Sequence, residues 1–262
     1  MKFLAKWRLR KPADDAETVY VSEKYGVRSL HIGSETIQSA MRIARPNDLE
    51  LAYTRSMMAF LLFSDRPTRV LMIGLGGGSL AKFVYHHLPW VTTEAVEVNP
   101  RVVAIARQCF QVPEDDARLR VIIGNGAEHM TQAGRVFDVI AVDGYDGESQ
   151  VEELSDKSFY AACHARLDSG GVLVVNLWGS DRKFHETLAR IEAVFPSGTL
   201  CLPAEKPGNI IVFAFRHCPQ SWRWDALAAR ARELERQYGL EFPRFVASLR
   251  KMNRHDKDQL FV

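Results

Sequence analysis

From residue 69 onward, short apolar runs alternate with longer segments of helical character. The runs expected to form strands are 69–73 (RVLMI), 93–98 (TEAVEV), 119–123 (LRVII), 137–143 (FDVIAVD) and 170–177 (GGVLVVNL). Helices are expected to begin near Gly78, Pro100, Gly126 and Ser155. Regular alternation of strand and helix is typical of a parallel, doubly wound sheet with helices on both faces. The pattern therefore predicts an α/β fold for this part of the chain.

Both ends of the chain show different patterns. Three β-branched runs at 18–23, 27–32 and 36–43 are separated by glycines suited to turns, which predicts a small antiparallel element. We expect an N-terminal β-hairpin element over 1–45 and the main domain over 46–262. The dense apolar segment 49–63 predicts a buried helix capped by Asn47 or Asp48. The runs 199–203 and 209–215 suit a hairpin, and 222–240 suits an amphipathic helix.

Composition narrows the function classes. The chain has 262 residues, 47% of them hydrophobic, and a formal net charge of +2. Because binding to bulk phosphate needs a strong basic excess, we expect no nucleic-acid partner. The longest apolar runs are shorter than the roughly 18 residues of a membrane span, and the N-terminus lacks the apolar core of a signal peptide. These features predict a cytoplasmic protein without a membrane partner.

Cysteine usage indicates no metal site. The four cysteines are scattered, with no CxxC pair and no histidines at metal-ligand spacing. We expect reduced thiols and no metal cofactor.

A glycine-rich loop follows the first strand of the alternating region, in the sequence VLMIGLGGGS (70–79). Gly74, Gly76 and Gly78 form a G-x-G-x-G pattern where glycines let a ligand approach the N–H groups at the start of a helix. A dinucleotide fingerprint needs a third glycine where Ser79 stands, so the loop matches NAD poorly. The loop favours a nucleoside of the S-adenosylmethionine (AdoMet) type, and a tight turn without ligand is the alternative.

Two further positions support a nucleoside. Glu97 ends the second strand about twenty residues after the loop, where a carboxylate can accept hydrogen bonds from both ribose hydroxyls. Asn125 and Ala127 follow the third strand, where an adenine ring would lie, and Gly126 between them is expected in the same site. Asn125 equally suits a helix cap that needs no ligand, and the sequence leaves both interpretations open.

The fourth strand ends in an acidic segment. Asp143 and Asp146 flank Gly144 and Tyr145 at the carboxyl end of the strand, where open α/β sheets build their sites. Three glutamates of the following loop add negative charge, and they also suit a solvated loop: Glu148, Glu152 and Glu153. Such a cluster would attract a cationic substrate and repel an anionic one.

The segment from about residue 19 to residue 215 resembles the spermidine synthase (polyamine aminopropyltransferase) family. The resemblance rests on VLMIGLGGGS, VEVNP, VIIGNGAEHM and VDGYD…LSDKSFY, in the order and spacing of the family. It implies a Rossmann-like fold of the AdoMet-dependent methyltransferase type with an N-terminal β element. It also implies transfer of an aminopropyl group from decarboxylated AdoMet to an amine such as putrescine. We further expect a homodimer or larger homo-oligomer.

The resemblance assigns roles to individual residues. It implies that Glu97 binds ribose, that Asp146 deprotonates the attacking amine and that Asp143 holds the amine substrate. Tyr53 matches the tyrosine that precedes a His/Gln-Glu pair of the family. Gln38 stands where a nucleoside-contacting glutamine is expected.

The chain departs from the family pattern at several positions. Ser79 replaces a loop aspartate that contacts the aminopropyl amine, and Asn125 replaces an adenine-contacting aspartate. Thr54 and Arg55 replace the His/Gln-Glu pair, and the segment 201–209 (CLPAEKPGN) lacks the tyrosine of a PTYP-like motif. These departures leave two alternatives open: a methyltransferase that uses intact AdoMet, or a nucleoside-binding protein without catalysis.

Overall fold

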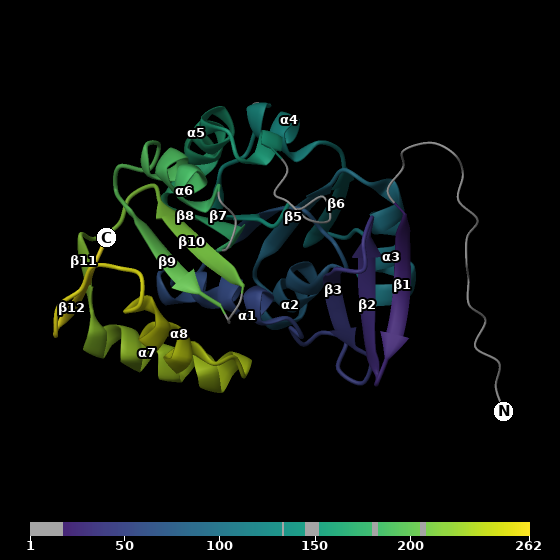
Figure 1. The fold of residues 1–262 in the computed structure, drawn as a ribbon, viewed down its shortest axis with the longest axis horizontal. Coiled ribbons are helices and arrows are strands. Elements are labelled where there is room, and N and C mark those ends of the chain that lie inside the picture. Colours follow the sequence, from purple (N-terminus) through teal and green to yellow (C-terminus); the bar gives the residue numbers. More distant parts are fainter. Residues whose placement is uncertain (1–17, 133, 145–151, 180–182, 205–207) are drawn as a thin grey trace.

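The computed structural model describes residues 18–132, 134–144, 152–179, 183–204 and 208–262. Its centre is a seven-stranded sheet with the order β6-β5-β4-β7-β8-β10-β9 (Figure 1). The strands are β4 (Arg69–Ile73), β5 (Thr92–Glu97), β6 (Leu119–Ile123), β7 (Phe137–Val142), β8 (Leu167–Trp178), β9 (Thr199–Pro203) and β10 (Asn209–Phe215). The first five are parallel, and β10 runs antiparallel to both β8 and β9. The doubly wound sheet and the terminal hairpin predicted from the sequence are confirmed.

The order of the strands fixes where a ligand can bind. The chain leaves β4 toward β5 and β6, and it returns to the other side of β4 as β7. In open α/β sheets the crevice at such a reversal, outside the carboxyl ends of the strands, is the usual ligand site. The glycine loop after β4, Glu97 at the end of β5 and Asp143 just after β7 all lie at this edge.

Helices cover both faces of the sheet because the strands are apolar on both faces. In β4, Val70 and Met72 belong to one core cluster, whereas Leu71 and Ile73 belong to the other. The first face packs against α1 (Ala52–Met57), the 3₁₀ helix η1 (Met58–Leu62), α2 (Ser79–His87), α3 (Pro100–Phe110), α7 (Trp224–Tyr238) and α8 (Phe242–Leu249). The second face packs against α4 (Gly126–Thr131), α5 (Lys157–Arg166) and α6 (Phe184–Glu192).

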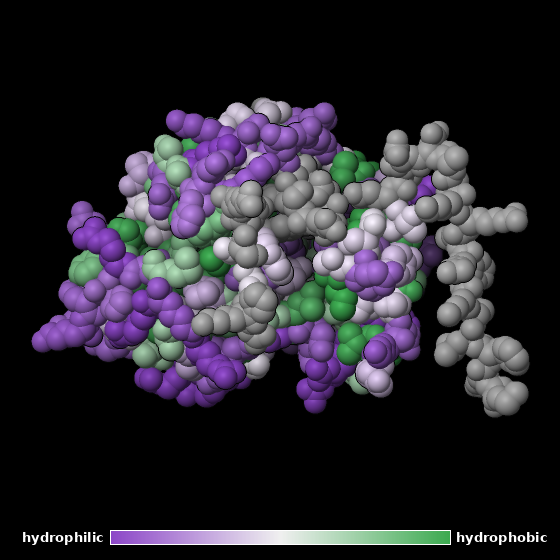
Figure 2. Space-filling view, viewed as in Figure 1, coloured by the Kyte–Doolittle hydropathy of each residue, from purple (hydrophilic) through white to green (hydrophobic). Residues whose placement is uncertain are grey.

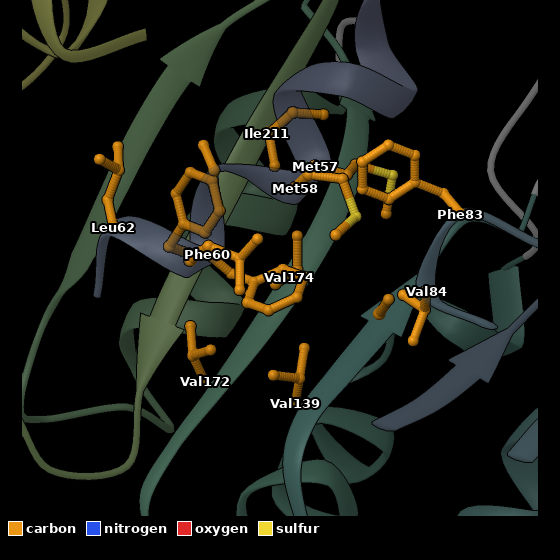
Figure 3. Close-up of a cluster of buried hydrophobic side chains, with 14 of the residues drawn as sticks. Met57, Met58, Phe60, Leu62, Phe83, Val84, Val139, Val172, Val174 and Ile211 are labelled. Carbon is orange, nitrogen blue, oxygen red and sulfur yellow. The ribbon is translucent and has the colours of Figure 1, made fainter. Parts of the chain in front are cut away.

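Figure 3 shows the centre of the first cluster, where α1 and η1 lie against the strands. Met57, Met58 and Phe60 are almost fully buried there, and they face Val174 and Ile211. Burial of each such side chain contributes about 1.5–3 kcal/mol relative to leaving it exposed. The predicted buried helix at 49–63 therefore forms part of the main core.

The start of this helix differs from the prediction. The helix begins at Ala52 after Leu51, without a side-chain cap, and the predicted caps Asn47 and Asp48 lie in the preceding turns. The carbonyl groups just before the helix are used in side-chain contacts instead: Arg55 donates to those of Leu49 (3.3 Å) and Glu50 (2.7 Å). Because Arg55 engages these carbonyl groups and Leu51 is extended, the helix starts later than the local capping signal indicated.

A small antiparallel sheet of β1 (Val19–Lys24), β2 (Val27–Ile32) and β3 (Ile37–Arg42) stands beside the main domain, at the side away from α7 and α8 (Figure 1). Its buried Leu30 and Met41 pack against Val102 and Phe110 of α3. The three predicted runs form the three strands. The division into 1–45 and 46–262 stays a prediction.

The C-terminal part returns to the first face of the sheet. In α7 the buried residues Trp224, Leu227, Ala231 and Leu234 recur at three- and four-residue spacing, as predicted for an amphipathic helix. Hydrophilic residues cover the outer side of α7 and α8 (Figure 2). Two short strands, β11 (Ser221–Arg223) and β12 (Gln259–Phe261), pair beside α7. Within the described ranges no helix is long and apolar enough to cross a membrane.

Lys82 joins the small sheet to the main domain. Its side chain is 1% exposed, and Nζ donates to the carbonyl groups of Phe110 (2.6 Å) and Pro46 (2.7 Å) and contacts Sδ of Met41 (3.1 Å). Burial lowers the pKa of Lys82 from 10.5 to about 8. One buried amine thus links α2, the end of α3 and the segment that follows β3.

The lowered pKa of Lys82 predicts a pH dependence of stability. In the window between about 8 and 10.5 the unfolded chain binds more protons at this group, so its contribution to the free energy of unfolding rises with pH. We expect the wild type to gain about 3 kcal/mol relative to Lys82→Met across this window. Urea unfolding of both proteins at several pH values measures the difference, and a difference that does not change with pH would contradict the assignment.

Candidate active site

A cavity of about 140 Å³ lies at the carboxyl ends of β4, β5 and β7. Eight of the residues predicted for the site line it: Gln38, Tyr53, Gly74, Gly76, Glu97, Asn125, Gly126 and Asp143. A smaller cavity continues from it toward α2, where Ser79 and Thr54 join Tyr53, Gly74 and Asp143. Residues scattered over more than a hundred positions of the sequence are therefore brought to one site. The predicted base, Asp146, lies outside the described residues.

The glycines of the loop have separate structural reasons. Gly74 has φ +93°, and a Cβ there would come 2.2 Å from the carbonyl oxygen of Asp143. Gly78 stands at the start of α2 with φ +69°, and a Cβ there would come 2.2 Å from Cγ2 of Val112. Gly74 thus lets the ends of β4 and β7 approach one another, whereas Gly78 packs away from the cavity. A ligand contact of Gly78 stays a prediction.

The carboxylate of Glu97 is anchored by the backbone of the site. Oε2 accepts hydrogen bonds from the N–H groups of Leu75 (3.0 Å) and Gly76 (3.5 Å), and Oε1 accepts one from Asn99 (3.0 Å). A carboxylate has about four acceptor positions and three N–H groups use three of them, so about one position remains for a hydroxyl group of a ligand. The sequence did not predict this second role, which fixes the glycine loop to the end of β5.

The small N-terminal sheet supplies one wall of the site. Ser39 of β3 lines both cavities, and its Oγ accepts a hydrogen bond from the N–H of Gly77 (2.8 Å). The hydroxyl of Tyr53 lies 3.2 Å from the carbonyl oxygen of Gln38 and shares its one proton between that oxygen and Asp143. Ser39 was not predicted, because a serine in a strand gives no signal of a contact with a loop 38 residues away.

A chain of amides orients Asp143. Nδ2 of Asn176 donates to Oδ1 of Asp143 (2.8 Å), and Oδ1 of Asn176 accepts from Nδ2 of Asn209 (2.9 Å). Burial raises the pKa of Asp143, and the hydrogen bonds from Asn176 and Tyr53 oppose that rise. Neither asparagine was predicted. The sequence held one signal, since Asn176 is a polar residue near the end of an apolar strand, where it is 3% exposed.

Asn125 is the N-cap of α4. Its Oδ1 accepts from the N–H groups of Ala127 (2.8 Å) and Glu128 (3.3 Å), and its Nδ2 donates to Oε2 of Glu153 (2.7 Å). The capping interpretation of Asn125 is therefore confirmed. Its contact with a base stays a prediction.

The two residues that follow Tyr53 make hydrogen bonds within the protein. Nε of Arg55 donates to Oε1 of Glu241 (2.8 Å), which ties α1 to the start of α8, and Oγ1 of Thr54 donates to the carbonyl group of Leu51 (2.7 Å). Among the residues that the structure describes, no three His, Cys, Asp or Glu side chains are grouped so that they could hold a metal ion.

The sequence matches a known family and curated relatives. Residues 50–214 match the model of the spermine/spermidine synthase domain. The chain is 41% identical over 255 residues to the polyamine aminopropyltransferase of Chromobacterium violaceum, covering 97% of this chain and 98% of that protein. It is 40% identical over 247 residues to the polyamine aminopropyltransferase of Neisseria meningitidis serogroup A, covering 94% of each.

Solved structures show the same fold. A probable spermidine synthase from Corynebacterium glutamicum superposes with a TM-score of 0.72 at 20% identity, covering 92% of this chain and 94% of that one. A spermidine synthase in complex with the transition-state analogue AdoDATO has a TM-score of 0.63 at 22% identity, covering 88% and 84%. Human methyltransferase-like protein 13 in complex with SAH has a TM-score of 0.64 at 28% identity, covering 79% and 96%.

The predicted Rossmann-like fold of the methyltransferase type is thereby confirmed, and so is the predicted family. The family match covers the glycine loop, Glu97, Asn125 and Asp143 in one continuous segment. With most of its length aligned to two curated relatives at about 40% identity, this chain belongs to the spermine/spermidine synthase family.

Proposed function

We propose that this protein transfers the aminopropyl group of decarboxylated AdoMet to a cationic amine, with a diamine such as putrescine as the acceptor. The observation that carries the proposal is the charge of the site. Among the described residues that line the two cavities, Glu97, Asp143 and Glu153 are acidic and none is basic. Such a site suits a ligand that carries a sulfonium and an ammonium group, and it offers no cation to the carboxylate of intact AdoMet.

The proposed roles follow from where the residues lie. The ribose hydroxyls donate to Glu97, and Gln38 contacts the nucleoside from β3. Asp143 lies where the two cavities meet, so its carboxylate holds an ammonium group of the substrate, with Asn176 and Tyr53 fixing its orientation. Opposite charges at short range in a partly buried site attract strongly enough to position the amine.

The proposed chemistry is a single displacement. The neutral amine nitrogen attacks the methylene carbon bound to the sulfonium, and a C–N bond forms while the C–S bond breaks. The electron pair of the C–S bond stays on sulfur, so methylthioadenosine leaves as a neutral thioether. Before the attack, Asp146 takes the proton from the ammonium form of the amine, which leaves the nitrogen neutral. A sulfonium is already a good leaving group, so the enzyme mainly supplies an oriented, neutral amine.

A methyltransferase that uses intact AdoMet is the second candidate. Ser79 favours it, because a neutral hydroxyl at the start of α2 would not repel the methionine carboxylate. The absence of a basic side chain among the described lining residues disfavours it.

Release of methylthioadenosine tests the proposed function. With decarboxylated AdoMet, we expect methylthioadenosine to accumulate only when a diamine is present. With intact AdoMet and the same diamine, we expect neither methylthioadenosine nor S-adenosylhomocysteine above the enzyme-free rate. Formation of S-adenosylhomocysteine alone would favour the methyltransferase, and no release from either nucleoside would contradict both candidates.

Glu97→Gln is expected to weaken the binding of methylthioadenosine by about 1.5–3 kcal/mol, the range for hydrogen bonds to a charged group. Glutamine keeps an oxygen that can accept from the loop N–H groups, so the loop is disturbed less than it would be by alanine. Glu94→Gln, on the same strand but outside the cavity, is the matched control. Titration calorimetry measures both, and equal affinity in both variants would remove Glu97 from the proposed site.

A further inference from the structure

In one part of the main cavity the polar residues Asn125 and Glu153 occur together with the apolar residues Ile73 and Leu154. Ile73 and Leu154 line the cavity beside Gly126, the residue that follows Asn125, and Leu154 directly follows Glu153 in the sequence. The backbone is close here: a Cβ at Gly126 would come 2.4 Å from Cγ2 of Ile73, and one at Gly144 would come 2.3 Å from Cδ1 of Leu154. Apolar side chains and bare backbone suit a flat aromatic ring, and the two polar residues would face the rim of that ring.

Asn125 has little capacity left in this part of the cavity. Its Oδ1 already accepts two N–H groups of α4, and one N–H of its amide already goes to Glu153. Using Oδ1 for a ligand would cost the cap of α4, which is typically worth about 1 kcal/mol. Asn125 therefore cannot act as a strong acceptor for a ligand without loosening its helix.

Glu153 offers a ligand the hydrogen-bond acceptor that Asn125 lacks. Only its Oε2 is engaged by a described residue, namely by Asn125, so Oε1 faces no donor from the described part of the chain. The same part of the chain provides no basic side chain that pairs with this carboxylate. Glu153 belongs to the short 3₁₀ helix η2 (Glu152–Leu154), and the hydrogen bond from Asn125 holds its side chain at the rim of the cavity.

We infer that Glu153 selects the base: its carboxylate accepts a hydrogen bond from the 6-amino group of adenine, oriented by Asn125. This inference rests on the proposed function, since it assumes that a purine nucleoside occupies the cavity. An ionised carboxylate only accepts hydrogen bonds, so it matches an amino group and opposes a ring carbonyl. Hypoxanthine, which carries an oxygen in place of that amino group, would place two acceptors against each other. The site should therefore prefer adenine nucleosides.

Competition between two nucleosides tests this role. We expect the wild type to bind methylthioadenosine at least about tenfold more tightly than methylthioinosine, the low end for a hydrogen bond to a charged group. In Glu153→Gln the preference should fall to about threefold or less, because an amide can turn a donor toward the carbonyl group. The neighbouring Glu152→Gln changes a glutamate outside the cavity and should keep the wild-type preference.

The ratio of the two affinities separates selection from a structural role. A merely structural role of Glu153 would lower both affinities together and leave their ratio unchanged, which would overturn the inference. Equal binding of the two nucleosides by the wild type would also overturn it, and the proposed function would stand. If the wild type binds neither nucleoside, both the inference and the proposed function are wrong.

Discussion

Asp146→Asn is expected to lower turnover by roughly 10²–10⁴, the usual contribution of a positioned general base, and to leave the affinity for methylthioadenosine unchanged. An alkylammonium with a pKa near 10.4 is about 3.4 units above neutral pH, so deprotonating it costs roughly 4–5 kcal/mol. Asparagine keeps the shape of aspartate and removes its ability to take the proton. Steady-state kinetics and calorimetry on the same samples measure the two quantities.

The pH profile distinguishes a lost base from a damaged site. Raising the pH should partly restore the turnover of Asp146→Asn, because more of the amine is then neutral without help. Glu148→Gln, two residues further along the same acidic segment, should behave as the wild type. Wild-type turnover in Asp146→Asn near pH 7 would exclude the proposed role.

A second substitution is expected to have a large effect on the binding preference of the protein for decarboxylated over intact AdoMet. We expect Ser79→Asp to raise the preference for the decarboxylated form by several-fold to about a hundredfold. Ser79 lines the small cavity together with Asp143, and the described residues there include no basic side chain. A carboxylate at position 79 would pair with the ammonium of the aminopropyl arm and repel the carboxylate of intact AdoMet. A solvent-screened pair is worth about 1 kcal/mol or less, and a partly buried pair is worth more.

Competition binding of the two nucleosides to wild type and Ser79→Asp measures this preference. The wild type should discriminate more weakly than the variant. Asp143 lines the same cavity as Ser79, so its carboxylate is the competing source of selectivity. A wild type that rejects intact AdoMet strongly, with no further change in Ser79→Asp, would show that Asp143 suffices and that the argument from Ser79 is wrong.

Local patterns predicted the sheet because its strands are continuous apolar runs between turn residues. The same reasoning missed α6, although Phe184, Thr187 and Ile191 are buried at three- and four-residue spacing, a signal present in the sequence. It also missed α8, which begins at Phe242 only two residues beyond the predicted end of the preceding helix. Both helices therefore carry a signal in the sequence that is sufficient to predict them.

Other features depend on contacts between distant residues, which a single sequence does not reveal. The link from Arg55 to Glu241 spans 186 positions, and the link from Asn176 to Asn209 spans 33. The cavity itself was well predicted, because the ends of parallel strands meet at one edge and the predicted residues sit at those ends. What the sequence could not predict was how that edge is supported: the anchoring of Glu97 by the loop, the contact of Ser39 with Gly77 and the pairing of Asn125 with Glu153.

The most direct test of aminopropyl transfer is the mass of the amine product. The purified protein is incubated with decarboxylated AdoMet or with intact AdoMet, each with a panel of amines, and the products are analysed by mass spectrometry. We predict that a diamine gains the mass of one aminopropyl group with decarboxylated AdoMet and gains nothing with intact AdoMet. A gain of one methyl group from intact AdoMet, or no gain in any mixture, would contradict the proposed function.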